Sequence, residues 1–285
     1  MAHATQTYSL SDVLAHDKTR FNGNNHGPAP ADYHEVLRRT ATHKWIHLFH
    51  DPETYAIITL DAADLWWMRE AARVGAVTRR ASHLFDDEIE STCAKYAQEM
   101  DAVNQRLPPD AQGWFVRSDR CSLKEGVHGA GPYADMRRVL ESIVSTTPGH
   151  NPIDPRGEQM TLYFMPWVDM DPEKELRVFV ERNRVTAISA QHLYRVNRWL
   201  VEGDTDAVIS KVLEFFARDV RDKLSNLENY TMDVVLVGET ETPYFIETNS
   251  FGAAYAAGSA LFHWIEDHEV LSGARPIELR YVDRP

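Results

Sequence analysis

Two short apolar runs separated by a polar loop predict an antiparallel hairpin near the C-terminal end of the chain. The runs are TMDVVLV at 231–237 and PYFIETN at 243–249, and the loop between them is centred on Thr240. A symmetric hairpin of this length places three pairs of residues directly opposite one another: Val237 and Pro243, Val235 and Phe245, and Asp233 and Glu247. Opposed residues in such a pair have Cβ atoms about 4.5–5.5 Å apart.

Asp233, Glu247 and Asn249 are expected to gather on one face of this hairpin. Asn249 lies two residues beyond Glu247, so its side chain leaves the strand on the same side. Two carboxylates at that distance repel each other unless a cation or a proton lies between them. Mg²⁺ prefers such oxygen ligands and completes its shell with water and phosphate oxygens. The pattern predicts a magnesium site, although a solvent-facing acidic hairpin would show the same alternation.

The composition excludes several classes of protein. The chain has 285 residues, with 43 acidic and 30 basic side chains and a formal net charge of −13, which argues against nucleic acid as the main partner. No apolar run approaches the roughly 18–20 residues of a membrane span. The first residues lack a basic start followed by an apolar stretch, so we expect no secretion signal. Two cysteines, Cys93 and Cys121, fit a reducing cytoplasm.

The N-terminal part is expected to be mixed, with several helices. Residues 22–32 indicate a loop, WIHLF and YAIITL indicate strands, and Asp61 indicates the start of a helix. A longer helix is expected over 86–107, and Trp66 and Trp67 are expected in the core. His43, His47 and His50 have helical spacing, but the strand prediction and the lack of a matching carboxylate disfavour a metal site there.

The remaining two thirds of the chain are expected to form strands connected by hairpins, with a few helices. Strands are expected at TLYFMPWV, ELRVFVER and RVTAISAQ, with a turn at Arg182 and Asn183. Helices are expected over 136–144, 206–227 and 254–270, and the polar stretch 146–159 is expected to be a hinge or an exposed loop. The fold class is therefore α+β and differs from the regular alternation of a doubly wound parallel sheet.

Basic residues are available for phosphate binding, but each has a second explanation. Arg117 ends a predicted strand, and Lys124 follows in a loop that contains Gly126, Gly129 and Gly131. Glycines let backbone N–H groups approach phosphate closely, yet a solvated turn has the same composition. Arg177 shares a strand face with Glu175. It forms either a surface ion pair, worth little, or a contact to phosphate.

These segments, in this order, resemble the ATP-grasp superfamily, in particular the branch related to cell division cycle protein 123. The resemblance covers about 114–270, and its most specific parts are LYFMPWVDMDPEKELRVFVERNRVTAISAQ and DVVLV with YFIETNSFG. It implies an ATP-grasp fold in which two β-sheet subdomains hold ATP between them, with an α-rich N-terminal region. Residues 1–110 would form the acceptor or partner side, and 111–285 the nucleotide- and metal-binding region.

The resemblance also implies roles for individual residues. Arg117, Lys124 and Arg177 would contact phosphates, and Lys124 and Arg177 would take part in catalysis. The backbone of Met165, Trp167 and Val168 would bind adenine, and Asp169 or Asp171 would meet the ribose. Asp233, Glu247 and Asn249 would hold Mg²⁺. Glu247 stands where the eukaryotic proteins more often have aspartate, and glutamate is the common choice in catalytic ATP-grasp ligases.

Two functions follow from the resemblance. The first is an ADP-forming ligase that uses Mg²⁺ and ATP to activate a carboxylate as an acyl-phosphate for attack by an amine. The second is an ATP-binding assembly factor for a protein partner, because the eukaryotic relatives are associated with assembly of a translation initiation complex. The sequence names neither the carboxylate nor the amine. Basic residues available for an acceptor pocket are His26, Arg38, Arg39, Arg79 and Arg80.

Overall fold

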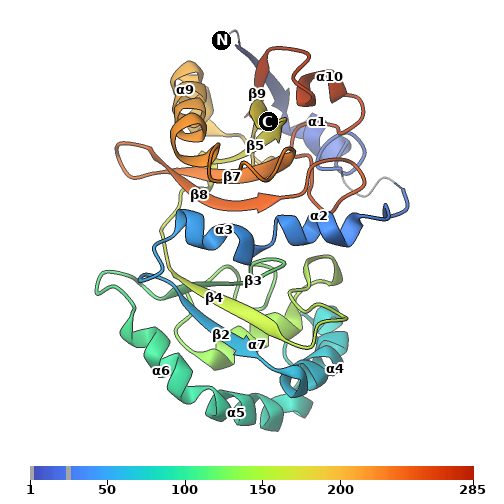
Figure 1. Ribbon diagram of the computed structural model, residues 1–285. Coiled ribbons are helices and arrows are strands. Elements are labelled where there is room, and N and C mark those ends of the chain that lie inside the picture. Colours follow the sequence, from blue (N-terminus) through green and yellow to red (C-terminus); the bar gives the residue numbers. More distant parts are fainter. Residues whose placement is uncertain (1–2, 24–26) are drawn as a thin grey trace. The chain divides into compact units, whose positions relative to one another are not determined.

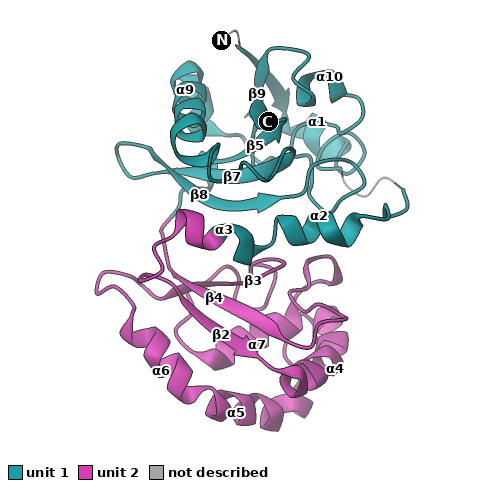
Figure 2. Cartoon of the chain, in the orientation of Figure 1, with its two compact units in different colours: residues 1–45, 170–285 teal, residues 46–169 magenta. Residues whose placement is uncertain are grey.

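The computed structural model describes residues 3–23 and 27–285, so His26 lies outside the described residues. The chain forms two compact units, and Figure 2 shows them in different colours. Unit 1 contains Met1–Trp45 and Met170–Pro285, and unit 2 contains Ile46–Asp169. The boundary expected between 110 and 111 falls inside unit 2. The compact units therefore do not coincide with the two expected regions, and the partner-binding role of 1–110 remains an expectation.

Unit 1 is built on a mixed six-stranded sheet with the order β1-β9-β6-β5-β7-β8. The strands β5 to β8 pair with antiparallel neighbours, whereas β9 is parallel to both β1 and β6. The bounds are β1 His3–Ser9, β5 Glu175–Glu181, β6 Arg184–Ala190, β7 Tyr230–Val237, β8 Thr242–Asn249 and β9 Ile277–Arg284. The expected turn between β5 and β6 is present, since Arg182 and Asn183 both have positive φ, as a two-residue hairpin turn requires.

Short helices surround this sheet (Figure 1). They are α1 Leu10–Ala15, α2 Tyr33–Arg39, η3 Pro172–Lys174, α8 Arg198–Glu202, α9 Thr205–Phe215 and α10 His268–Leu271, and α3 Thr42–Phe49 crosses from unit 1 into unit 2. The helix α9 continues as a π-helical turn, η4 Phe216–Val220. The apolar positions expected along this helix are buried in the structure: Val208, Val212, Phe215, Phe216, Val220 and Leu224.

Unit 2 contains a three-stranded antiparallel sheet with the order β2-β4-β3. Its strands are β2 Ala56–Leu60, β3 Trp114–Ser118 and β4 Met160–Pro166, and its helices are α4 Ala62–Thr78, η1 His83–Phe85, α5 Asp86–Lys95, α6 Ala97–Gln105, α7 Met136–Ser145 and η2 Pro148–His150. Asp61 caps α4 as expected, because its side chain accepts from Ala63 and Asp64 while Asp64 bonds back to the Asp61 backbone. The helices bury their apolar sides in one core together with the sheet.

The strand expected at WIHLF is wrong, because this segment belongs to helix α3. Trp45 and Ile46 are buried while Lys44 and His47 are exposed. This is the spacing of one helix face, and it does not alternate as the residues of a strand would. Most residues of this segment are apolar, so the helical spacing of its buried residues could not be recognised from the sequence.

Other expected helices also differ from the structure. The helix over 86–107 is two helices that meet at Tyr96, whose hydroxyl donates to Asp64 at 2.7 Å. The helix over 254–270 is wrong, since only α10 is helical there. Its first part has small residues, including Gly258, without a helical apolar period, and it bonds to the N-terminal segment through Asn22 N to Ala260 O at 2.6 Å.

One smaller expectation fails as well. Trp66 is 70% exposed and does not belong to the core, whereas Trp67 is buried as expected. The elements β1 and α1 precede the segment expected to be a loop at 22–32. The stretch 146–159 lies within unit 2 and, apart from η2, is a largely exposed loop, which is one of the two alternatives expected for it. Among the described residues, no helix combines the length and the apolar character that a membrane span requires.

Candidate functional site

The hairpin of β7 and β8 places Asp233 directly opposite Glu247, as the sequence predicted. The other two expected pairs are wrong, since Val235 lies opposite Tyr244 and Val237 opposite Thr242. The loop is one residue shorter than expected, and a β-bulge between Asp233 and Val234 restores the register beyond it. The predicted loop was one residue too long and the bulge was not predicted. These two errors of one residue each cancel at the pair of Asp233 and Glu247.

Arg177 forms a buried ion pair with Asp233. The two residues are neighbours across β5 and β7. Arg177 Nε donates to Asp233 Oδ1 at 2.9 Å, and Nη2 donates to Oδ2 at 2.7 Å. The remaining nitrogen, Nη1, donates to the Gly258 carbonyl at 2.7 Å. Of the two alternatives for Arg177, the surface ion pair with Glu175 is not present, because Arg177 is buried against Asp233 and Glu175 lies 3.4 Å from His192.

Asn249 joins the two carboxylates. Its Nδ2 donates to Asp233 Oδ2 at 3.4 Å and to Glu247 Oε1 at 3.3 Å. Glu247 and Asn249 are half-buried, so this end of the group has contact with solvent. The structure thus brings together four of the residues predicted for the site: Arg177, Asp233, Glu247 and Asn249.

The donor set suits a hard divalent cation. It supplies the carboxylate oxygens of Asp233 and Glu247, and Asn249 would add its amide oxygen if its amide turned by half a turn. These are ligand types that Mg²⁺ takes together with water and phosphate. The described residues contain no cluster of three or more His, Cys, Asp or Glu side chains arranged for a metal. Two carboxylates and an amide would therefore hold an ion that receives further ligands from water or from a bound anion.

Burial and charge act in opposite directions on Asp233. Burial and, less strongly, the negative charge of Glu247 raise the pKa of the Asp233 carboxyl, while Arg177 lowers it, and together they bring this pKa to about 6. The pKa of Arg177 stays above its usual range, because attraction to Asp233 outweighs the effect of burial. The two bonds from Arg177 favour the ionised form of Asp233. One positive and two negative formal charges face one another, which leaves an excess of negative charge for a cation.

The other predicted residues lie mostly in unit 2. Arg117 is buried in β3, and Lys124 is exposed in the loop after it. Met165 is buried in β4, Trp167 and Val168 are half-buried, and Asp169 is exposed. The Trp167 N–H donates to the Gly113 carbonyl at 2.9 Å, so this N–H already has a partner within unit 2. Asp171 belongs to unit 1, where it caps η3 by accepting from Glu173 N.

The glycine loop at 126–131 packs against α7. The Val127 N–H donates to Ser145 Oγ at 2.9 Å, and the Tyr133 hydroxyl donates to the Gly129 carbonyl at 2.6 Å. A Cβ on Gly126 would come within 2.5 Å of the Ser142 carbonyl oxygen. The close approach to α7 therefore explains why residue 126 is a glycine, and a bound phosphate is not needed to explain it.

The sequence did not predict the contact between the N-terminal segment and Gly258, whose carbonyl accepts a hydrogen bond from Arg177. A Cβ on Gly258 would lie 2.2 Å from Asn22 Oδ1, so the N-terminal segment packs closely on the residue that accepts from Arg177. Gly23 and Ser259 exchange two further hydrogen bonds, Gly23 N to Ser259 Oγ at 3.1 Å and Ser259 N to Gly23 O at 3.2 Å. Neither segment has a local sequence pattern that would predict a contact between residues more than 200 positions apart in the chain.

The histidines at 43, 47 and 50 lie in or next to α3. Burial and, second, the positive charge of Arg117 together lower the pKa of His50 to about 4. The neutral form of this imidazole is therefore the stable one in the folded protein.

His50 is expected to make stability depend on pH between about 4 and 6.5. In this window the unfolded chain binds a proton at His50 and the folded chain does not, so the free energy of unfolding rises with pH. A tenfold change in proton affinity corresponds to about 1.4 kcal/mol, so the effect is at most about 3 kcal/mol. Urea unfolding across this window would show a shallower pH dependence for His50→Gln than for the unaltered protein. His83→Gln is the matched control, because the His83 side chain is 99% exposed. Equal slopes in all three proteins would contradict this assignment.

A sequence profile of the D123 family matches residues 135–285, which is more than half of the chain. The chain belongs to the D123 family. The D123 match includes all four residues gathered around the β7–β8 hairpin. A search of curated proteins found no match.

Solved structures support the same grouping at the level of the fold. The structure of Cdc123 from Schizosaccharomyces pombe has a TM-score of 0.61 and 14% identity, covering 87% of this chain and 97% of that one. A C-terminally truncated form of the same protein has a TM-score of 0.59, with 14% identity and the same coverage. A RimK domain protein, ATP-grasp, from Sphaerobacter thermophilus has a TM-score of only 0.27 at 15% identity, covering 40% of this chain and 36% of that one. The two Cdc123 matches show that this D123 family member shares their fold.

Proposed function

We propose that this D123 family member binds ATP together with Mg²⁺, and that Asp233, Glu247 and Asn249 hold the metal. The observation that supports this most directly is that Asn249 lies within hydrogen-bond distance of both carboxylates, with its Nδ2 at 3.4 and 3.3 Å. A half-turn of this amide would bring its oxygen to the same place, where it would be a metal ligand. Opposed carboxylates on neighbouring strands are costly unless a cation compensates them. The single charge of Arg177 is bound bidentately to Asp233, so the charge of Glu247 beside it favours a second cation.

Arg177 has two proposed tasks. Its bidentate bond fixes the Asp233 carboxylate, which leaves only the outward lone pairs of that group for an ion. A guanidinium carries five N–H donors, and three of its bonds here go to Asp233 and Gly258. The donors that remain suit a phosphate oxygen, as the ATP-grasp resemblance implies. Arg117 and Lys124 are proposed as further phosphate contacts, and the 165–171 segment as the adenosine contact.

The proposed reaction is ADP-forming ligation of a carboxylate and an amine on an ATP-grasp scaffold. Bound Mg²⁺ would neutralise charge on the β- and γ-phosphates. A substrate carboxylate oxygen would attack the γ-phosphorus and release ADP, and an amine would then displace phosphate from the acyl-phosphate to form an amide. The protein would supply orientation and charge and no covalent nucleophile.

Calorimetry and product analysis would test the two parts of this proposal separately. ATP is expected to bind in the presence of Mg²⁺ and to bind much more weakly with EDTA. With hydroxylamine in place of the amine, pooled amino acids, peptides and other carboxylates are expected to yield a hydroxamate and an equal amount of ADP. AMP and pyrophosphate would contradict the acyl-phosphate route. Tight ATP binding without ADP release from any carboxylate would replace ligation by the assembly-factor function.

Lys124→Ala is expected to weaken ATP binding far more than AMP binding. The Lys124 side chain is exposed, and within the described residues it forms no hydrogen bond or ion pair, so its removal leaves no buried partner behind. Loss of one charge-assisted contact to the β- or γ-phosphate should cost about 1.5–3 kcal/mol. Calorimetric titration of both nucleotides would measure this difference, with Lys44→Ala, another exposed lysine, as the control. Equal losses for ATP and AMP would remove Lys124 from the phosphate site.

A further inference from the structure

The segment that follows Asn249 leads from the proposed metal ligands to the main-chain group that binds Arg177. The Gly258 carbonyl at its end accepts a hydrogen bond from Arg177 Nη1 at 2.7 Å. Between these two points, residues 250–257 form no helix or strand and are mostly small. Small side chains make few packing contacts, and a segment with few contacts opens easily. The Gly258 carbonyl therefore needs support from another part of unit 1.

The N-terminal loop, residues 16–23, gives this support through hydrogen bonds to the residues directly after that carbonyl. Gly23 N donates to Ser259 Oγ at 3.1 Å, and Ser259 N donates to the Gly23 carbonyl at 3.2 Å. Asn22 N donates to the Ala260 carbonyl at 2.6 Å. Gly23 and Ser259 are both buried, so removal of the Ser259 hydroxyl would leave the Gly23 N–H without an acceptor.

The N-terminal loop is itself held in place. Phe21 is 1% exposed and belongs with Leu261 to one buried apolar cluster. Asn22 has a left-handed backbone conformation, φ 50°, and its Nδ2 donates to the Tyr194 hydroxyl at 3.0 Å. That hydroxyl donates in turn to Asp17 Oδ1 at 2.8 Å. An uncommon backbone conformation persists only where the surroundings enforce it, so the loop offers a fixed support.

Gly258 and Asn22 approach so closely that a side chain at 258 would not fit without moving a neighbour. A Cβ there would lie 2.2 Å from Asn22 Oδ1 and 3.8 Å from Arg177 Nη1. The Asn22 carboxamide could move aside only by breaking its bond to Tyr194. Position 258 therefore lies between the N-terminal loop on one side and Arg177 on the other.

We propose that the N-terminal loop is part of the nucleotide site and sets the direction of the Arg177 guanidinium. Ser259 is the positioning residue, because it binds the loop and acts on Arg177 through the Gly258 carbonyl. Asp233 binds Nε and Nη2 of Arg177, and this carbonyl binds the remaining nitrogen, Nη1. The carbonyl thereby sets the direction of the N–H groups left for phosphate. The loop lies outside the part of the chain that the D123 profile matches. The consequence for ATP rests on the proposed function, whereas the effect on Arg177 itself does not.

Proton exchange at the Arg177 Nε–H group, measured by heteronuclear NMR on the full chain without nucleotide, would test this positioning. The group is buried and donates to Asp233, so it is expected to exchange slowly with water. Ser259→Ala and Gly258→Ala are each expected to speed the exchange at least about tenfold, because either change displaces the carbonyl at 258. Asn22→Gly combined with Gly258→Ala is expected to restore most of the slow exchange. This double variant lacks the carboxamide that the new Cβ would meet, and glycine accepts the positive φ at position 22.

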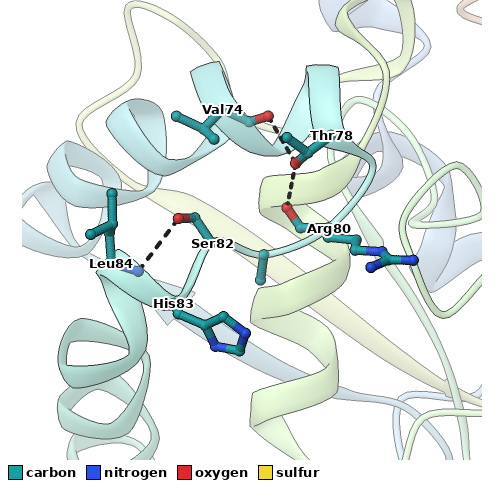
Figure 3. Close-up of a pocket in the computed structure, with 7 residues that line it drawn as sticks. Val74, Thr78, Arg80, Ser82, His83 and Leu84 are labelled. Atoms are coloured by element: carbon teal, nitrogen blue, oxygen red, sulfur yellow. Dashed lines mark hydrogen bonds between the residues drawn. The ribbon is translucent and has the colours of Figure 1, made fainter.

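Gly75→Ala is the matched control for a general loss of stability. A Cβ at Gly75 would lie 2.0 Å from the Val144 carbonyl oxygen, so this change also crowds a glycine, but in unit 2. Figure 3 shows the end of α4 around this position, with Val74 and Thr78 labelled. Exchange at Arg177 is expected to be unchanged in this variant. Equal acceleration in Gly75→Ala, or unchanged exchange in both single variants of unit 1, would overturn the proposal.

Calorimetric titration with ATP in the presence of Mg²⁺ connects this positioning with the proposed function. Ser259→Ala is expected to weaken ATP binding at least about fivefold, whereas Gly75→Ala is expected to leave it unchanged. Faster exchange at Arg177 together with unchanged ATP affinity in Ser259→Ala would place the N-terminal loop outside the nucleotide site and overturn the proposal. If the unaltered protein did not bind ATP at all, the proposed function would be wrong, and the exchange measurement would still decide whether the loop positions Arg177.

Discussion

Asp233→Asn is expected to lower the free energy of unfolding by about 3–5 kcal/mol, because it leaves a buried guanidinium without its counter-charge. Arg177 makes both of its ion-pair bonds to this one carboxylate, and both residues are buried. Considered from the sequence alone, removal of one carboxylate from the hairpin should relieve repulsion and preserve the fold. The position of Arg177 reverses that expectation for Asp233.

Chemical unfolding of three variants would measure this effect. Arg177→Met combined with Asp233→Asn removes both charges, so this double variant is expected to be more stable than Asp233→Asn alone. Glu35→Gln is the matched control in the same unit, since it breaks an Arg–carboxylate pair with Arg38 whose side chains are 46% and 71% exposed. Such a surface pair contributes about 0–1 kcal/mol. Similar losses in the free energy of unfolding for Asp233→Asn and Glu35→Gln would mean that the buried ion pair contributes no more to stability than the exposed one.

Glu247→Gln is expected to weaken Mg²⁺-dependent ATP binding at least about 100-fold, which corresponds to about 2.7 kcal/mol. The substitution keeps the shape of the side chain and its contact with Asn249 while it removes a charged oxygen ligand. Glu247 is half-buried, and the bidentate bonds of Arg177 go to Asp233, so the fold is expected to tolerate the change. This variant therefore separates metal binding from stability, which Asp233→Asn does not.

Titration calorimetry with and without Mg²⁺, together with unfolding measurements, would test this expectation. Glu239→Gln is the matched control, because Glu239 lies exposed at the tip of the same hairpin. The control should bind ATP as the unaltered protein does. If Glu247→Gln bound ATP with unchanged affinity and unchanged dependence on Mg²⁺, the metal assignment would be wrong.

Local patterns predicted the elements that arise from neighbours in the sequence. The hairpin of β7 and β8, the turn at Arg182 and Asn183, and the cap at Asp61 each depend on residues within one short segment. The opposition of Asp233 and Glu247 was predicted correctly because a shorter loop and a β-bulge offset each other. The register near the turn was wrong because nothing in the loop composition indicates which residue pairs first.

Such local patterns could not predict contacts between segments that are far apart in the sequence. The face of β5 that carries Arg177 could be predicted, but its partner depended on β7 lying beside β5, which only the sheet order determines. The residues around Gly258 read as helix because alanine favours helices. In the structure their bonds to Asn22 and Gly23 hold them in turns instead. The strands β1 and β9 were missed because a parallel pair leaves no turn between them.

The parallel pairing of β1 with β9 determines when unit 1 can be completed during synthesis. Residues 3–9 leave the ribosome long before their partners at 277–284. The segment 46–169 is continuous and has its own core, so it is available to fold while the sheet of unit 1 still lacks most of its strands. Nascent β1 therefore remains an unpaired strand until 277–284 have been made, and such an exposed edge is the kind that chaperones protect from aggregation.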